Sequence, residues 1–254
     1  MPEGYRKSVL PNGIRLVTEA MPHVRSVAAG VWVDTGSRVE PEDRGGISHL
    51  IEHLVFKGTA TRSAEEIARS IDSVGGHMDA FTAKEHTCFY VGVLDEHLPL
   101  AVDLLTDILM RPLFSAEDIE KEKSVVLQEI KMVEDTPDDL IHDIFAAQVW
   151  EGHPLGRPIL GTREAVTAYD RGEALGYFTE QYVPPRIIIA VDRGAAAGVV
   201  EWREAASSLT RIVIGVDQAA EVGMVVRPGA VEDGSLPRRI IVTVDRGVAA
   251  GEAG

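Results

Sequence analysis

The chain has 254 residues, of which 45% are hydrophobic and 26% are charged, and its net charge at pH 7 is −15. This length and this composition are typical of a globular protein that can bury a sizeable core. Such an acidic surface repels nucleic-acid phosphates and anionic lipid headgroups. We therefore expect neither a nucleic acid nor a membrane as a partner.

The spacing of the apolar residues predicts a mixture of strands and helices. A Pro-Asn-Gly turn joins the first two strands into a hairpin, and Gly or Pro residues end several of the helices. In chain order, we predict strands over 6–10, 14–18, 26–35, 77–81 and 86–94, and helices over 47–56, 63–74, 99–110, 115–133, 138–150 and 171–182. Because strands and helices do not alternate strictly, the order favours an α+β fold over a doubly wound sheet.

The composition changes after Pro184-Pro185, where the chain becomes rich in Gly, Ala and Val. Residues 186–198 (RIIIAVDRGAAAG) and 239–251 (RIIVTVDRGVAAG) are similar to each other, and we interpret them as two strand-turn units. We therefore predict a first domain over residues 1–190 and a divergent tail over residues 191–254.

The single cysteine, Cys88, excludes an intramolecular disulfide, and its apolar neighbours predict a small core residue rather than a nucleophile. The N-terminus has no apolar run of signal-peptide length, and no later run approaches the roughly 20 apolar residues of a membrane span. We expect a soluble, cytoplasmic protein.

The segment GGISHLIEHLVFKGT carries the motif with the most chemical content. His49 and His53 are four residues apart, so on a helix their rings project from one face and can share a tetrahedral zinc ion. Glu52 lies near the same face and is well placed to take a proton from a water molecule. Chance would produce this H-x-x-E-H pattern in roughly one such sequence in forty. Histidines without any metal are the alternative.

A catalytic zinc ion needs a third protein ligand, and the helix SAEDIEKEKSVVLQEIKMVED offers candidates. Glu122, Val126, Glu129 and Val133 share one helical stripe, where a bound dication would compensate the charge of two buried carboxylates. Alternatively, the stripe is partly solvated and its glutamates pair with lysines of the same helix, namely Lys121, Lys123 or Lys131. The stripe by itself favours this second interpretation.

Taken together, these segments resemble the pitrilysin/insulinase family of zinc peptidases, in particular its shorter members such as the mitochondrial processing peptidase β subunit. The resemblance covers about Arg6 to Pro185 and includes LPNGIRLVTE, GISHLIEHLVFKGT, GGHMDAFTAKEHTCFYVGVL, SVVLQEI and HPLGRPILGT. In the family, a glutamate at the position of Glu129 is the third zinc ligand, and one at the position of Glu122 supports the site from behind the ligands.

The resemblance also implies an architecture, a pitrilysin-like α/β roll in which a mostly antiparallel sheet packs with helices. Residues 1–190 would be the N-terminal catalytic domain, and a second homologous domain or subunit would close over the substrate like a clamshell. The substrate would lie as an added strand along the segment HMDAFT, with Asp79, Ala80 and Phe81 as binding residues. Many relatives have asparagine where Asp79 stands, and aspartate accepts but does not donate a hydrogen bond. His86 is a further candidate near the cleft, although such a residue is more often structural.

We therefore predict an endopeptidase that binds one Zn²⁺ per chain through His49, His53 and Glu129, uses Glu52 as its base, and cleaves unfolded peptides or presequences. The alternative is a catalytically impaired or non-catalytic subunit that binds peptides or acts as a scaffold and needs a partner domain. A purely structural zinc site is disfavoured, because such sites commonly use four Cys or His ligands. Residues 117–143 hold ten acidic residues and three lysines. This pattern is typical of a solvated helix face and, as a secondary hypothesis, would favour basic substrate segments.

Overall fold

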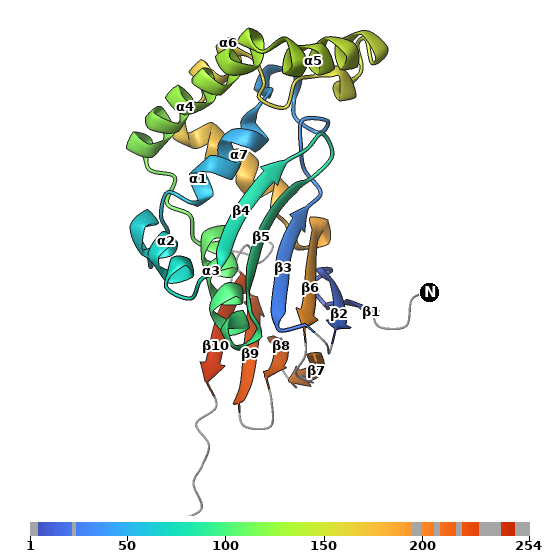
Figure 1. The fold of residues 1–254 in the computed structure, drawn as a ribbon, viewed down its shortest axis with the longest axis vertical. Coiled ribbons are helices and arrows are strands. Elements are labelled where there is room, and N and C mark those ends of the chain that lie inside the picture. The colour runs from blue at the N-terminus through green and yellow to red at the C-terminus, as the bar shows by residue number, and fades with distance from the viewer. Residues whose placement is uncertain are drawn as a thin grey trace, which may run out of the picture.

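The structure is a computed structural model, and it describes residues 5–21, 24–194, 200–205, 209–216, 220–228 and 240–246. Six strands form its main sheet, in the order β1-β2-β6-β3-β5-β4 (Figure 1). They are β1 (Tyr5–Val9), β2 (Arg15–Met21), β3 (Ser26–Val33), β4 (His77–Thr82), β5 (Thr87–Leu94) and β6 (Ile187–Gly194). Neighbouring strands are antiparallel except β2 and β6, which are parallel. The predicted α+β class and the mostly antiparallel sheet are confirmed.

Seven α-helices accompany this sheet in the described residues. They are α1 (Ile47–Val55), α2 (Ala64–Asp72), α3 (Leu98–Met110), α4 (Ala116–Asp135), α5 (Pro137–Val149), α6 (Arg163–Ala168) and α7 (Arg171–Gln181). The predicted capping box is present, because Ser63 and Glu66 each bind the other's backbone N–H at the start of α2. The six predicted helices end within two residues of their expected bounds. The sequence reasoning missed α6, which is too short for a periodic apolar pattern.

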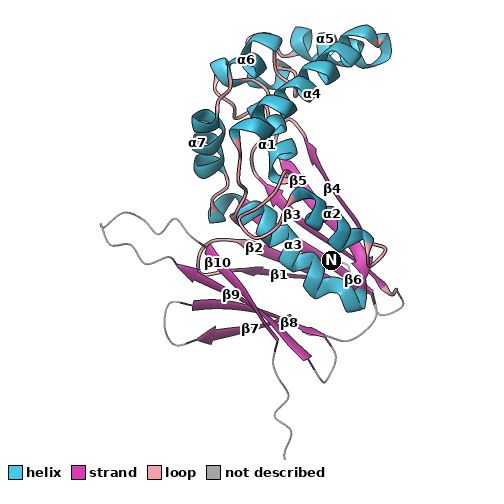
Figure 2. Cartoon of the chain, turned by 90° about the vertical axis from the view of Figure 1, so that its left-hand side faces the viewer, coloured by secondary structure: helices cyan, strands magenta, loops and turns pink. Residues whose placement is uncertain are grey.

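The hydrophobic core lies between one face of the sheet and the helices α1, α2 and α3, which Figure 2 shows on the same side of it. Alternate residues of β3 and β5 point into this core, as a two-residue period requires. The buried apolar side chains that these two strands contribute to it are Val27, Ala29, Val31, Val33, Phe89, Val91 and Val93. Cys88 is also buried, on the face of β5 opposite to Phe89, and its burial raises the pKa of the thiol to about 12. The prediction of a small buried residue rather than a nucleophile agrees with both observations.

The strand β4 forms one edge of the six-stranded sheet, where its outer backbone groups have no neighbouring strand among the described residues. Its side chains alternate between half-buried and exposed. Met78, Ala80 and Thr82 are half-buried, and Thr82 contacts α1. The intervening residues, His77, Asp79 and Phe81, are exposed on the opposite face. The edge is therefore open for an added strand directly beside α1.

The tail contributes a second, antiparallel sheet in the order β10-β9-β8-β7. Its strands are β7 (Val200–Ala205), β8 (Leu209–Val216), β9 (Ala220–Pro228) and β10 (Ile240–Arg246). The two similar segments of the tail each supply one strand, β6 and β10, which confirms the strand half of that interpretation; their predicted turns lie outside the described residues. The strand β6 runs across residue 190, and the division into domains there stays a prediction.

None of the helices in the described part of the chain combines the length with the apolar composition that crossing a bilayer requires.

Candidate metal centre

The helix α1, which carries the H-x-x-E-H motif, starts at a tightly built junction. Gly46 precedes it with a φ of +89°, and a Cβ there would lie 2.3 Å from the carbonyl oxygen of Leu160. The buried carboxylate of Glu40 accepts hydrogen bonds from the backbone N–H groups of Gly46 and Ser48, at 2.8 and 2.9 Å. It thus satisfies donors that have no partner within the helix. Burial raises the pKa of Glu40, and the hydrogen bonds from Ser48 and Gly46 oppose that shift.

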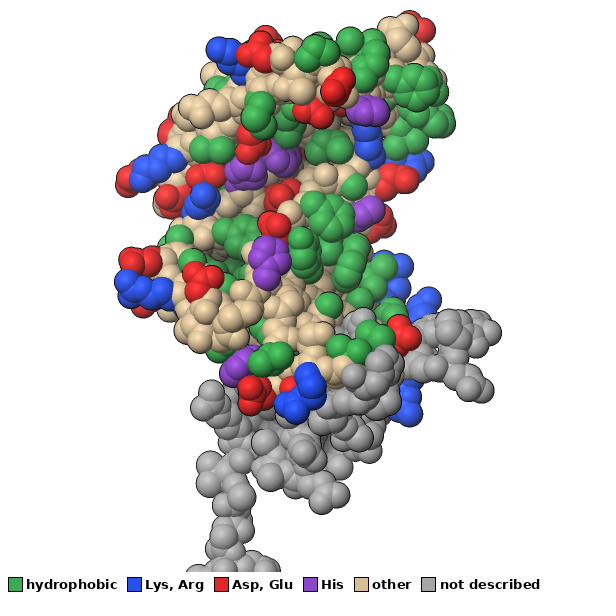
Figure 3. All heavy atoms as spheres, viewed as in Figure 1, with side chains coloured by type: hydrophobic (Ala, Val, Ile, Leu, Met, Phe, Trp, Pro, Cys, Tyr) green, Lys and Arg blue, Asp and Glu red, His purple; other side chains and the backbone are tan. Residues whose placement is uncertain are grey.

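The two faces of α1 have different roles. Ile47, Leu50, Ile51 and Leu54 are fully buried and fix the helix against the core. The histidines and Glu52 lie on the other face and are only half-buried. That face turns toward α4 and the edge strand β4. Figure 3 shows histidine and acidic side chains together on this side of the molecule.

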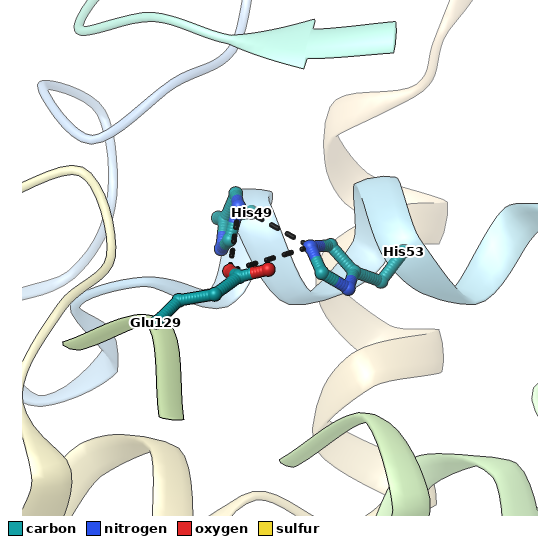
Figure 4. Close-up of side chains that lie close together, drawn as sticks. All are labelled: His49, His53 and Glu129. Carbon is teal, nitrogen blue, oxygen red and sulfur yellow. Dashed lines mark hydrogen bonds and ion pairs between the residues drawn. The ribbon is translucent and has the colours of Figure 1, made fainter. Parts of the chain in front are cut away.

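The structure brings the three predicted ligands together (Figure 4). Oε2 of Glu129, on α4, lies 3.6 Å from Nε2 of His49 and 3.7 Å from Nε2 of His53. The two Nε2 atoms are 3.3 Å apart. In a tetrahedral zinc site with metal–nitrogen distances near 2.0–2.1 Å, ligand atoms are about 3.3 Å from one another. The observed spacings fit such an ion, with three protein ligands rather than four.

The electrostatics of His49 also suit a metal ligand. Burial and, to a smaller extent, the charge of the neighbouring His53 together lower the pKa of this histidine to about 4. The imidazole is therefore neutral at pH 7, with a lone pair available for coordination. A positively charged ring would have to lose its proton first.

Glu122, the residue expected behind the ligands, contacts the second histidine of the motif and the lysine four residues beyond it. Its Oε2 lies 3.1 Å from Nδ1 of His53, and its Oε1 lies 2.8 Å from Nζ of Lys57. Two of the three lysines of α4 pair elsewhere: Lys121 with Glu117, and Lys123 with Glu120 and the carbonyl oxygen of Tyr169. The alternative that the stripe glutamates pair with those two lysines is therefore wrong. Sequence reasoning missed Lys57, whose only local signal is its spacing of four from His53.

Glu52 points toward the end of β4, where its carboxylate accepts a short hydrogen bond from the hydroxyl of Thr82. Burial raises the pKa of Glu52, and the bond from Thr82 and the charge of His53 partly oppose that shift. A carboxylate with a raised pKa is a better proton acceptor at neutral pH than an ordinary glutamate. Thr82 was also missed, because only the folded chain places it beside α1.

The predicted substrate-binding residues lie along β4 but do not share one face. Ala80 is half-buried on the side of α1, whereas Asp79 and Phe81 are exposed on the opposite face. Asp79 accepts hydrogen bonds from the N–H of Ala80 at 2.8 Å and from the hydroxyl of Tyr90 at 3.4 Å. His86 contacts the ring of Phe81, with the two ring centres 5.8 Å apart.

A cavity of about 240 Å³ opens between α2 and β4, beside the same edge. Its walls combine the apolar residues Phe56, Ile67, Ala68, Ile71 and Met78 with the polar residues Asp72 and His77. The cavity lies next to the open edge of β4.

The sequence matches the family described as "Insulinase (Peptidase family M16)" over residues 15–163. A similar curated protein, "Uncharacterized zinc protease YmxG" of Bacillus subtilis, is 49% identical over 180 residues, which are 71% of this chain and 44% of that protein. The chain spans about half the length of the curated relatives it matches.

Solved structures share the fold. A protease from Helicobacter pylori superposes with a TM-score of 0.72 at 21% identity, over 76% of this chain and 47% of that one. A structure from Pseudomonas fluorescens, described as a peptidase M16 inactive domain, superposes with a TM-score of 0.70 at 14% identity, over 76% of this chain and 47% of that one. At identities this low, the superpositions are evidence for the fold alone. They confirm the predicted pitrilysin-like roll.

Proposed function

Because the chain belongs to the insulinase family of peptidases, family M16, we propose that it is the metal-binding half of a zinc-dependent endopeptidase that cleaves unfolded peptides. The observation that carries this proposal is the convergence of His49, His53 and Glu129 within ligand spacing of one another, with Glu52 on the same face of α1. The names of the relatives, which describe zinc proteases, support the choice of metal.

The residues of the site divide the chemical work. One zinc ion per chain, held by the two histidines and Glu129, would supply Lewis-acid polarisation of the scissile carbonyl and of a water molecule. Glu52 takes the proton from the attacking water and passes it to the leaving amine. The hydrogen bond from Thr82 fixes the Glu52 carboxylate in front of the edge strand. The raised pKa of Glu52 supports the role of a base that operates near neutral pH.

The substrate is held in extended form. The peptide adds to the free edge of β4 by backbone hydrogen bonds, so its cleavage requires an unfolded segment. Ala80 lies on the side of β4 that faces α1, and Asp79 and Phe81 lie on the other side, where a neighbouring domain would contact the peptide. The cavity beside Phe56 and Met78 receives an apolar side chain of the peptide.

A second homologous domain or subunit completes the enzyme in this proposal. Support comes from the relatives and from the H. pylori protease, because this chain matches less than half of each of those longer chains. We further propose that the protein works in the cytoplasm, since its one cysteine is buried and needs no oxidising compartment.

The competing function is a non-catalytic peptide-binding subunit. The P. fluorescens structure described as an inactive domain shows that the fold occurs without activity. The clustering of all three metal ligands beside Glu52 favours the enzyme, because a scaffold has no need for this constellation.

A cleavage assay separates the two functions. The purified, zinc-loaded chain is incubated with a pool of unstructured peptides, and products are identified by mass spectrometry. Glu52→Gln and a chelator-treated sample should both lose cleavage, whereas Glu65→Gln, a change at an exposed glutamate on α2, should not. Absent cleavage with one zinc bound per chain would mean that the chain alone is inactive, either as an incomplete enzyme or as a non-catalytic subunit, and undiminished cleavage by Glu52→Gln would refute the assigned base.

The same peptide pool tests the hypothesis about charge. If the acidic residues of 117–143 attract the substrate, peptides with basic segments should be cleaved faster than acidic peptides of equal length, and added salt should narrow the difference. Equal rates for both classes would contradict it.

A further inference from the structure

Glu122 is a buried carboxylate on the face of α4 that turns toward the metal ligands. It lies on α4 next to the fully buried Val126, and only 6% of its surface is exposed. A second carboxylate, Glu129, is on the same stripe of the helix. A buried charge of this kind is costly unless a cation or several hydrogen bonds compensate it.

The compensation comes from Lys57. Among the described residues, Lys57 is the lysine or arginine in ion-pair contact with Glu122, with Nζ 2.8 Å from Oε1. The ammonium end of the pair is partly solvated, since 37% of the lysine side chain is exposed. The backbone N–H of Lys57 donates to the carbonyl oxygen of Leu54 at 3.1 Å, so the lysine is tied to the last turn of α1. The cation therefore lies just beyond the C-terminal end of the helix that carries the histidines.

The two oxygens of Glu122 act on different partners. Oε1 contacts Lys57, and Oε2 lies 3.1 Å from Nδ1 of His53, which donates a hydrogen bond to it. A histidine that donates from Nδ1 keeps its lone pair on Nε2. The Nε2 atom of His53 is the one that lies 3.7 Å from Glu129.

The other histidine lacks such support. Nδ1 of His49 is buried and has no hydrogen-bond partner among the described residues. Of the two histidines, His53 is therefore the one whose ring is oriented by a side chain outside the ligand set, within the part of the chain that the structure describes.

We propose that Lys57 is a positioning residue of the metal centre. Its ammonium group holds the carboxylate of Glu122 in the orientation in which Oε2 accepts the Nδ1–H of His53, and this contact fixes the tautomer and the ring angle of His53. The proposal rests on the proposed function in one respect, the assignment of His53 as a metal ligand.

The expected effect is a loss of zinc affinity. Removing a partner behind a metal-bound histidine typically costs 10–100-fold in affinity. Lys57 contacts His53 only through Glu122 and is therefore one contact further from the metal. We expect Lys57→Met to bind zinc about tenfold more weakly, near the lower end of that range. Lys57→Arg keeps the cation and should stay within about twofold of the original chain.

Competition between the chain and a fluorescent zinc chelator measures these affinities. Lys57→Gln accompanies Lys57→Met as a polar variant in case the apolar one fails to fold, and thermal melting checks both. Lys121→Met is the matched control, because that lysine is exposed and pairs with Glu117 on the surface of α4. A zinc affinity within twofold of the original chain for both Lys57→Met and Lys57→Gln would overturn the proposal. So would equal losses in Lys57→Arg and Lys57→Met, which would indicate packing rather than charge.

A second measurement needs no metal. Nitrogen-15 NMR of the histidine side chains in the zinc-free chain reports the tautomer of His53. The Nδ1–H form should dominate in the original chain and in Lys57→Arg, and a mixture should appear in Lys57→Met. An unchanged tautomer in Lys57→Met overturns the proposal even if the chain binds zinc. A chain that shows the tautomer shift but no zinc binding would instead refute the metal assignment in the proposed function.

Discussion

Replacing Glu40 by alanine is the sharpest test of how α1 is held. In the folded chain, Glu40 accepts hydrogen bonds from the N–H groups of Gly46 and Ser48, and all three residues are buried. The alanine variant leaves two buried donors without partners, each at a cost of about 1–3 kcal/mol. It also removes an anion from the N-terminus of a helix, a contribution of about 0.3–1 kcal/mol. Removing a desolvated charge offsets part of this, so we expect a net loss of about 3 kcal/mol in the free energy of unfolding.

Urea unfolding followed by circular dichroism measures this loss. Glu42→Ala is the matched control, since Glu42 lies in the same loop and is exposed; it should change the free energy of unfolding by less than about 0.5 kcal/mol. Similar urea midpoints for Glu40→Ala and Glu42→Ala would show that the buried carboxylate does not hold the helix.

The pH dependence gives an independent check, because burial raises the pKa of Glu40 above its ordinary value of 4.5. Between the unfolded and the folded pKa, the folded chain binds more protons than the unfolded chain. The contribution of Glu40 to stability is therefore fully present below the unfolded pKa and falls as pH rises through the folded pKa. The difference between the original chain and Glu40→Ala should be larger near pH 4.5 than at pH 8. A difference that grows toward pH 8 would contradict the assigned environment.

Three further variants test other parts of the site. Gly46→Ala should lower the free energy of unfolding by more than about 3 kcal/mol, because a Cβ would collide with the Leu160 carbonyl. Gly75→Ala is the control, also at positive φ but with open space around it, and should lower the free energy of unfolding by about 1 kcal/mol in the same urea assay. Thr82→Val loses the hydrogen bond to Glu52 and should lower kcat about tenfold with little change in KM, whereas Thr82→Ser should keep the original rate. Equal rates for the two variants would exclude a role of Thr82 in positioning Glu52. Ala68→Phe should fill the cavity between α2 and β4 and slow cleavage of peptides with large apolar side chains, as mass spectrometry of the pool would show; unaltered product patterns would separate the cavity from the substrate path.

Local signals in the sequence predicted the elements well. The capping box at Ser63 predicted where α2 begins, and the Pro-Asn-Gly turn predicted the first hairpin. These features depend on neighbouring residues, so they are readable without the fold. The spacing of the histidines predicted their common face on α1 for the same reason.

The contacts that complete the site depend on tertiary structure and could not be predicted. Glu40 and Glu42 stand two residues apart in one acidic loop, yet only Glu40 is buried and caps α1. The stripe on α4 allowed two interpretations, either glutamates at a metal site or solvated glutamates paired with lysines. The resemblance to a family, rather than the stripe itself, selected Glu129 as the third metal ligand. The partners of Glu52 and Glu122, namely Thr82 and Lys57, emerge only when β4 and α4 pack against α1.

The position of β6 between β2 and β3 constrains how the chain can fold during synthesis. In the strand pairing of the described residues, the hairpin β1–β2 joins the rest of the sheet through β6, and Arg15 pairs with Ile188 in that parallel ladder. Domains fold as their N-terminal parts leave the ribosome, so β3, β5 and the helices can assemble while the hairpin still lacks its neighbour. Until residues 187–194 emerge, one edge of β3 stays unpaired and open to other chains. Pairing β6 with β2 and β3 closes a loop of more than a hundred residues, and contacts between such distant segments form slowly. We therefore expect the pairing of β6 to limit the rate of folding.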